Sequence, residues 1–415
     1  MKKLMILFAG GFPYGISEPF LEQETPLYGD YFDKVLLVTS CKRGEQPTRP
    51  VDGTLMEVLS DYTVSKDLRS ILQALPWTLT DPMLWRELRM LLKQRKLSPR
   101  KLYDVLVTAL CGNHMALLAA RWQRTHAGYE TAVIYSYWLR IPGYAAVRLQ
   151  ARTRAACPSI SRAHGFDVYL ERHADGYIPF HRQIYQRLDL VAPVSEDGAA
   201  YLRAHYGMED KVRVCRLGAA CGGAAGPVAD RQPLRVVSCA RVVPLKRLER
   251  IADALQLISD RPIVWVHLGD GAGLDALRTY AAQTLPPNVR AEFRGGLSNK
   301  AVYETYRTEP FHLFLNVSET EGVPVAAMEA MHFGIPAVAT AVGGTPDLID
   351  DGVDGYLLPK AFRREELAKR LMEIADMPEA DYLRLREAAR AKIDRSYNAE
   401  RNYRSFLEMC ANGKN

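Results

Sequence analysis

Two glutamates, Glu321 and Glu329, have the residue type and spacing to serve a bound anion. Seven residues separate them: Glu321 lies in a short acidic loop after the apolar segment 311–317, and Glu329 lies in the early turns of the helix that follows. The free N–H groups at the start of such a helix receive anions, and the helix dipole favours negative charge there. A carboxylate on each side of this helix start suits a ligand with hydroxyls at both ends and phosphates in the middle.

This stretch resembles the signature of family 4 glycosyltransferases, which are retaining enzymes of the GT-B fold. The family pattern continues with a Gly-x-Pro turn and a Gly-Gly-x-Pro-acid loop, found here at 334–336 and 343–347, and the match extends through 351–358. Val323 stands where the family often has Phe, a change that we expect to alter the shape of the pocket more than its chemistry. The alternative interpretation is an ordinary α/β segment with surface acids.

The resemblance implies a donor that is a UDP- or GDP-sugar. Glu321 would hold the donor sugar and stabilise its cationic transition state, while Glu329 would hold ribose hydroxyls. The backbone leading into the helix would also contact the donor, through Gly322, Val323, Pro324 and Val325.

Two cations, Arg241 and Lys246, follow the first predicted strand of the second half of the chain. Their spacing matches the diphosphate clamp of the family. Fixed cations stabilise the negative charge that a leaving nucleoside diphosphate gains, with Arg gripping two oxygens and Lys acting as a point charge. We expect the neighbouring Arg247 and Arg250 to form only a solvated basic helix start.

Gly10 and Gly11 directly follow the first strand of the chain, where glycine lets the backbone approach a phosphate. We expect them to contact the diphosphate, although a tight turn would use the same residues. His164 directly follows the predicted strand 159–163 and matches a family histidine near the reacting carbon of the donor. We expect it to bond a sugar hydroxyl or phosphate, the alternative being a structural histidine.

The resemblance also places Arg294 in a loop that borders the nucleotide base. The chain contains no Asp-x-Asp sequence, which would be the usual metal–diphosphate site of the other main glycosyltransferase fold. We therefore expect no metal and no cofactor, with Arg241, Lys246 and the helix start taking the place of a metal. The mechanism favoured for the family is front-face attack, in which a donor phosphate oxygen takes the acceptor proton.

Short apolar runs alternate with helical stretches along the chain, which predicts buried parallel sheets. The expected fold class is α/β, of the GT-B type, with two Rossmann-like doubly wound domains facing across a cleft. We expect an acceptor-binding domain at 1–217, a small-residue linker at 218–233, and a nucleotide-sugar-binding domain at 234–395. A final helix, at about 396–415, is expected to pack back on the first domain. The predicted strands are 3–9, 35–39, 132–136, 159–163, 190–194, 234–240, 263–268, 289–294, 311–317 and 337–340.

Composition narrows the partners. A net charge of +6 over 415 residues is too small by itself to imply nucleic acid. Seven scattered cysteines and no run of the roughly 18 apolar residues typical of a membrane span favour a cytoplasmic protein. The segment 85–101 is basic and punctuated by Leu, Met and Trp. It could lie on the anionic inner membrane, or it could be a solvated face of the first domain.

The predicted function is a retaining, metal-independent hexosyltransferase of surface polysaccharide assembly, as in capsule, exopolysaccharide or lipopolysaccharide synthesis. It would use a glycan or a lipid-linked glycan as acceptor. Two alternatives stay open: a nucleotide-sugar epimerase of the same fold, and a catalytically silent partner that only binds sugar nucleotides.

Overall fold

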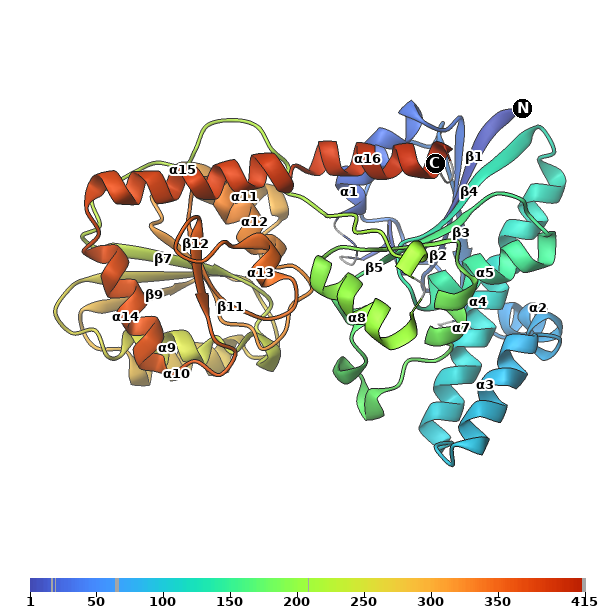
Figure 1. The fold of residues 1–415 in the computed structure, drawn as a ribbon, viewed down its shortest axis with the longest axis horizontal. Coiled ribbons are helices and arrows are strands. Elements are labelled where there is room, and N and C mark those ends of the chain that lie inside the picture. Colours follow the sequence, from blue (N-terminus) through green and yellow to red (C-terminus); the bar gives the residue numbers. More distant parts are fainter. Residues whose placement is uncertain (16–17, 19, 64–66, 208, 413–415) are drawn as a thin grey trace. The chain divides into compact units, whose positions relative to one another are not determined.

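The computed structural model describes the chain except residues 16–17, 19, 64–66, 208 and 413–415 and the side chain of Ala174. The chain divides into unit 1, which comprises Met1–Cys215 and Glu400–Asn415, and unit 2, which comprises Arg216–Ala399. Each unit has its own parallel sheet with helices packed against it (Figure 1).

The sheet of unit 1 has the strand order β3-β2-β1-β4-β5-β6, and every neighbouring pair is parallel. The central strand β1 is buried along most of its length, as expected where helices cover both faces of a sheet. The strands are β1 (Lys2–Ala9), β2 (Lys34–Ser40), β3 (Met56–Asp61), β4 (Tyr129–Ser136), β5 (Ser159–Ala163) and β6 (Leu190–Pro193). The longer helices are α2 (Leu68–Leu79), α3 (Pro82–Lys93), α4 (Pro99–Thr125), α5 (Ile141–Thr153), α8 (Glu196–Tyr206) and α16 (Ala399–Asn412).

Helix α4 is long and apolar enough to cross a membrane by length and composition, although the sequence led us to expect no such segment. However, 61% of its most apolar window is buried inside the protein. It contacts α2, α3 and α5 as well as the sheet. Its apolar composition is therefore explained by its place in the core of unit 1.

Helix α16 belongs to unit 1, although it ends the chain. Phe406, Leu407 and Cys410 are buried in the same core cluster as β1 and β4. The ring of Phe406 lies 5.0 Å from that of Tyr135, and the guanidinium of Arg162 lies 3.9 Å from the Phe406 ring. These contacts fix the C-terminal helix to the first sheet.

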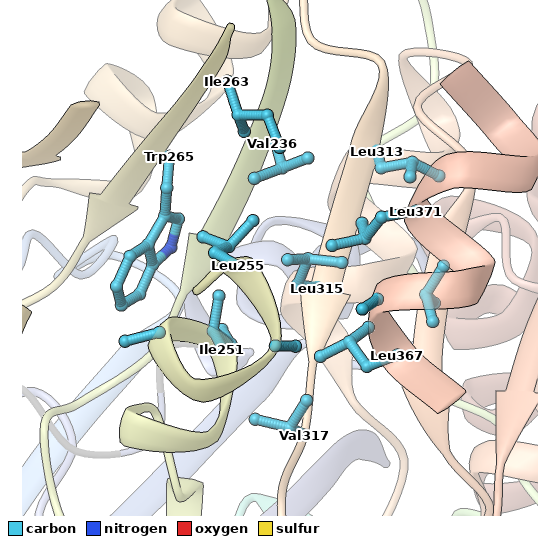
Figure 2. Packing of buried hydrophobic residues seen from close by; sticks show 14 of the residues in the cluster. Val236, Ile251, Leu255, Ile263, Trp265, Leu313, Leu315, Val317, Leu367 and Leu371 are labelled. Carbon is cyan, nitrogen blue, oxygen red and sulfur yellow. The ribbon is translucent and has the colours of Figure 1, made fainter. Parts of the chain in front are cut away.

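The sheet of unit 2 repeats this topology, with the order β12-β11-β10-β7-β8-β9 and parallel pairing throughout. Its core fills the space between the sheet and two helices, α9 (Glu249–Leu255) and α14 (Arg364–Ala375). Figure 2 shows Val236, Leu313 and Leu315 of the sheet facing Leu255 and Leu371 of these helices. The strands are β7 (Leu234–Cys239), β8 (Ile263–Leu268), β9 (Val289–Phe293), β10 (Leu313–Asn316), β11 (Ala337–Thr340) and β12 (Gly355–Leu358).

In both sheets the strand order reverses at the centre, between β1 and β4 in unit 1 and between β7 and β10 in unit 2. Ligands of open α/β sheets bind beyond the carboxyl ends of the strands at this kind of switch point. The loops that leave these four strands are therefore the places to look for function in each unit.

Candidate functional site

In unit 2, the loops after β7 and β10 bring Lys246 against Glu321. Lys246 Nζ lies 2.6 Å from Glu321 Oε1, and the amide of Asn316 donates to the same oxygen at 3.2 Å. The N–H of Glu319 donates to the carbonyl of Leu245 at 2.9 Å, so the two loops are also joined through their backbones. The cation and the carboxylate are therefore fixed relative to each other.

The pair keeps Glu321 ionised. Burial acts to raise the pKa of this carboxyl, but the charge and hydrogen bond of Lys246, with hydrogen bonds from Ser318 and Asn316, hold the pKa below its usual range. A charged pair that is already oriented needs no rearrangement when charge develops on a bound ligand. This site can therefore present a negative oxygen and a positive nitrogen side by side.

A glycine loop supports the backbone at Glu321. Gly343 has φ +52°, and a Cβ at this position would lie 2.0 Å from the carbonyl oxygen of Glu321. The N–H of Gly344 donates to the carbonyl of Gly322 at 2.6 Å. The Gly-Gly pair that the sequence marks as part of the motif therefore allows the second loop to approach the first.

The three arginines near Lys246 behave differently from one another. Arg241 is exposed, and its side chain forms no hydrogen bond or ion pair with the residues that the structure describes. Arg247 donates to the carbonyls of Val317 and Ser318, and Arg250 donates to the carbonyl of Phe362. The expectation that Arg247 and Arg250 form only a solvated basic helix start is therefore wrong: Arg247 braces the loop that carries Glu321, and Arg250 is bonded to the backbone at Phe362.

Glu329 lies on α12 (Val325–His332), with Asn299 donating to its Oε1 at 2.7 Å. Burial raises the pKa of Glu329 to about 7, and the hydrogen bond from Asn299 offsets only part of that effect. This carboxyl is thus poised between its neutral and charged forms, in contrast to Glu321.

The segment between the two glutamates prepares the start of α12. Pro324 is the N-cap residue, and its carbonyl accepts from the N–H groups of Ala327 and Met328. The N–H of Val325, in the first turn, has no acceptor within the helix. Val323 is buried, whereas Gly322 is half-buried. An anion at this helix start would meet backbone donors.

Arg294 is held away from this pair by other carboxylates. Its guanidinium donates to Glu309 through both terminal nitrogens and to Glu292 at 3.1 Å. None of its contacts within the described part of the chain involves Lys246 or Glu321. The proposed contact of Arg294 with a nucleotide base stays a prediction.

In unit 1, the N–H groups of Gly10 and Gly11 are taken by a residue that the sequence analysis overlooked. Glu18 accepts from Gly10 at 2.6 Å, from Gly11 at 2.8 Å, from Phe12 at 2.6 Å and from the indole of Trp138 at 2.6 Å. Each carboxylate oxygen accepts two of these bonds. A diphosphate contact by Gly10 and Gly11 stays a prediction, and in this structure it would require Glu18 to move. The only sign of this contact in the sequence is that an acidic residue, Glu18, follows Gly10 by eight positions.

His164 packs against Trp138, the residue whose indole donates to Glu18. The centroid of its ring lies 4.8 Å from that of Tyr137 and 4.7 Å from that of Trp138. Burial, with the charge of Arg162, lowers the pKa of His164 to about 3, so the imidazole is neutral. With Nε2 assigned as the protonated nitrogen, it donates to the carbonyl of Tyr137 at 3.1 Å. The other nitrogen is then an acceptor, which suits a hydrogen bond to a hydroxyl.

A cavity of about 560 Å³ opens beyond the ends of β1, β2 and β4 in unit 1. Trp138 and Phe166 supply aromatic faces, and Lys42, Arg140 and Glu18 supply charged groups. Aromatic rings with a few polar groups at the rim suit a ring-shaped, hydroxylated ligand.

One group of residues in the described chain has side chains placed to hold a metal ion. Ligand atoms of Cys221, His332 and Asp394 lie within 4.8 Å of one another. His332 ends α12, a helix of eight residues whose first turn follows Glu321. At 1.5 Å per residue, the group lies about 10 Å along the helix from that first turn. It offers nothing to the Lys246–Glu321 pair.

Comparison with known protein sequences finds glycosyltransferases. Residues 226–392 match the family model described as glycosyl transferases group 1. The chain is 29% identical over 245 residues to the provisionally named colanic acid biosynthesis glycosyltransferase WcaL of Escherichia coli K12, covering 57% of this chain and 60% of the relative. It is 30% identical over 261 residues to the amylovoran biosynthesis glycosyltransferase AmsK of Erwinia amylovora, covering 59% and 62%. The chain thus spans about three fifths of the curated relatives that it matches.

Two solved structures share the whole fold. The lipopolysaccharide outer core galactosyltransferase WaaB superposes with a TM-score of 0.70 at 13% identity, covering 98% of both chains. Anabaena Alr3699/HepE, solved with UDP, superposes with a TM-score of 0.68 at 17% identity, covering 99% of this chain and 100% of that one. The predicted fold class, two doubly wound α/β domains of the GT-B type, is confirmed.

Proposed function

We propose that this chain, whose residues 226–392 match the family model of the group 1 glycosyl transferases, is a retaining glycosyltransferase of surface polysaccharide biosynthesis. It would move a hexose from a UDP- or GDP-sugar to a glycan or lipid-linked glycan on the cytoplasmic side of the membrane. The observation that carries the proposal is the Lys246–Glu321 pair at the switch point of the second sheet. The names of WcaL and AmsK, and the UDP and UDP-glucose bound by HepE, support the donor and the process.

In this proposal, different residues of unit 2 bind different parts of the donor. The diphosphate would lie at the start of α12, where backbone N–H groups face it and Lys246 contributes a fixed positive charge. Arg241, which has no partner within the described chain, would swing onto the outer phosphate oxygens. As the glycosidic bond breaks, these donors stabilise the negative charge that develops on the leaving group. No metal ion is needed for this step.

Glu321 would act at the sugar end. Its carboxylate is held ionised by Lys246, so it can stabilise the positive charge that develops at the anomeric carbon. We propose front-face attack, with a donor phosphate oxygen taking the acceptor proton, and no covalent intermediate on Glu321. Glu329 would accept hydrogen bonds from ribose hydroxyls, and this acceptance is strongest when it is ionised.

Unit 1 would hold the acceptor. Its cavity combines the faces of Trp138 and Phe166 with the charged rim of Lys42 and Arg140, which suits a sugar ring. His164, neutral and bonded to the backbone through one nitrogen, would offer the other to a sugar hydroxyl. Peripheral contact of the segment 85–101 with the inner membrane is also part of this proposal, because a lipid-linked acceptor would lie there.

Calorimetry with UDP and GDP tests the assignment of the two glutamates. Glu329→Gln should weaken nucleotide binding by roughly 1.5–3 kcal/mol, because a charged acceptor is lost. Glu321→Gln should leave nucleotide binding nearly intact and lower transfer instead. Glu319→Gln, a half-exposed acid of the same loop, is the matched control. The opposite pattern would reverse the placement of the donor, and a changed sugar without any acceptor would identify an epimerase.

A further inference from the structure

Helix α2 presents its leucines to solvent and its small residues to the protein. Leu68, Leu72, Leu75 and Leu79 recur at intervals of four, three and four residues, so they form one stripe along the helix. They are 69%, 58%, 39% and 53% exposed. The opposite face is formed by Ser70, Ala74 and Thr78, which are buried. An amphipathic helix on a protein in water normally turns the other way.

The next helix, α3, adds positive charge beside this stripe. Trp85 is half-exposed, and its indole N–H donates to the carbonyl of Leu79 at 2.8 Å, so the start of α3 lies against the end of α2. Figure 1 shows α2 and α3 beside α4 in unit 1. Arg86, Arg89 and Lys93 are exposed on one face of α3 and line a shallow hollow of about 420 Å³.

The exposed charges of the segment 68–103 are all positive. Seven cations between residues 68 and 103 are exposed, and over that range, all of it described, no acidic side chain is exposed. None of the seven forms an ion pair with a described carboxylate. They are Arg69, Arg86, Arg89, Lys93, Arg95, Lys96 and Arg100.

Exposed apolar side chains are concentrated here as well. Of the sixteen large hydrophobic residues that are exposed in the described chain, eight lie between residues 68 and 106, and the others are spread over the rest of the chain. Scattered exposed leucines need no explanation, but a concentration of exposed apolar side chains in one segment points to a contact surface. The eight residues are Leu68, Leu72, Leu75, Leu79, Trp85, Leu92, Tyr103 and Leu106.

We propose that α2 and α3 form a membrane-docking surface, in which the leucines of α2 and Trp85 enter the lipid interface and the cations of α3 bind anionic headgroups. Charge complementarity selects this occupant, because an anionic lipid surface offers both an apolar layer and a plane of phosphates. The hollow lined by Arg86, Arg89 and Lys93 can take one headgroup phosphate. The inference extends the proposed contact of segment 85–101 by assigning insertion to α2, and it does not depend on sugar transfer.

Binding of the full chain to vesicles tests this surface. The chain should bind vesicles that contain phosphatidylglycerol and bind vesicles of pure phosphatidylcholine much more weakly. The combined change Arg86→Gln, Arg89→Gln and Lys93→Gln should weaken binding to the anionic vesicles on the order of 100-fold, from roughly fivefold for each cation. The matched control uses three exposed cations of unit 2, Arg290→Gln, Lys369→Gln and Arg384→Gln, and should bind as the parent does.

A second variant tests the exposed leucines of α2. The triple change Leu68→Ser, Leu72→Ser and Leu75→Ser should lower binding by roughly tenfold or more at any salt concentration. Its control is Leu257→Ser with Leu383→Ser, which removes two exposed leucines from unit 2. Bromine-labelled lipid tails should quench part of the tryptophan fluorescence, and that part should vanish in Trp85→Phe.

Three results would overturn the inference. One is the absence of binding to anionic vesicles by a folded chain that still binds UDP. Another is equal vesicle binding by the leucine variant and its control. The last is light scattering that shows an oligomer dissociated by Leu72→Glu, because the surface would then be a contact between copies. A chain that docks on vesicles but transfers no sugar would contradict only the proposed function.

Discussion

Unit 1 and unit 2 share one strand order, yet the ends of their central strands are prepared for different charges. In unit 1, the N–H groups of Gly10, Gly11 and Phe12 surround the carboxylate of Glu18, so this anion site is filled by the chain itself. In unit 2, Lys246 pairs with Glu321, while Arg241 is left without a partner among the described residues. Topology thus marks the switch point of each sheet as a candidate site, but the side chains give the two candidate sites different charges.

The difference has a simple electrostatic origin. In unit 1, the N–H groups of Gly10, Gly11 and Phe12 already donate to the carboxylate of Glu18, so this backbone offers no donors to a phosphate unless Glu18 moves. In unit 2, Lys246 is paired with one carboxylate, that of Glu321. Arg241 and the start of α12 add further positive charge, so the electrostatic potential of this region stays positive. We therefore expect the anionic part of a ligand to be bound by unit 2 and its neutral partner by unit 1.

The largest effect should come from removing the cation of unit 2. Lys246→Ala should lower the transfer rate by about 30- to 1,000-fold, which is roughly 2–4 kcal/mol, by analogy with the loss of one preorganised donor. The pKa of Glu321 should also rise, because burial remains and the compensating charge is gone. The acidic limb of the pH–rate profile should accordingly move to higher pH.

Lys360→Ala, which alters an exposed lysine of the same unit, is the control for this change. Steady-state rates of folded Lys246→Ala close to those of the parent would remove Lys246 from the active site. They would also contradict the inference that the anionic part of the ligand is bound by unit 2.

The next largest effect should come from Glu18, whose carboxylate accepts from the N–H groups of Gly10, Gly11 and Phe12 in unit 1. Glu18→Gln replaces one acceptor oxygen with an amide that faces N–H groups, so we expect unit 1 to lose about 3 kcal/mol of unfolding free energy. Glu45→Gln is the control, since Glu45 lines the same cavity but is exposed. Urea denaturation of both proteins measures the difference. Equal stability would mean that these N–H groups do not need an anion.

A smaller effect should appear in the pH dependence of stability. Burial raises the pKa of Glu329 to about 7 in the folded protein, whereas a glutamate in the unfolded chain titrates at about 4.3. The folded state therefore holds this proton longer, and the parent loses stability as pH rises through that window. Glu329→Gln cannot ionise and escapes this loss.

Relative to the parent, the Glu329→Gln variant should gain on the order of 2 kcal/mol between about pH 5 and about pH 8. Urea denaturation at the two pH values measures this change. Glu319→Gln is the control, because its side chain is half-exposed. A constant difference between parent and variant would show that Glu329 ionises normally.

The smallest expected effect is that of chelation. We expect the charges of Arg241 and Lys246 to serve in place of a metal, so EDTA should leave the transfer rate unchanged. A rate that falls to zero and returns only with Mn²⁺ or Mg²⁺ would contradict this. Metal analysis of the purified chain should be run alongside, because Cys221, His332 and Asp394 could retain an ion without any role in transfer.

Much of the fold could be read from local patterns. All ten predicted strands overlap strands of the structure. Eight of them are interior strands, which are continuous apolar runs, and the other two, β6 and β9, lie at sheet edges. The two that were missed, β3 and β12, lie at the edges of their sheets. An edge strand is covered on fewer sides, and most residues of β3 are only partly buried, so its sequence lacks a clear apolar run. The division of the chain falls at Cys215 and Arg216, beside the glycine-rich segment that begins at Gly218.

The sequence by itself determined the parts of the site that are close along the chain. The spacing of Glu321 and Glu329 fixes one in a loop and the other on the helix that follows, because a helix advances by a constant rise and turn. The same holds for the distance between Arg241 and Lys246 within one loop. These relations need no tertiary contact.

Only the tertiary structure decided which charge meets which. Glu18 lies on the N–H groups of Gly10 and Gly11, Arg294 is held by Glu309, and Arg247 supports the loop of Glu321. In the same way, the heptad-like spacing of leucines in α2 shows an apolar stripe, but only packing shows that the stripe faces outward. Periodicity is a local property of the chain, whereas partners and exposure depend on how distant segments pack.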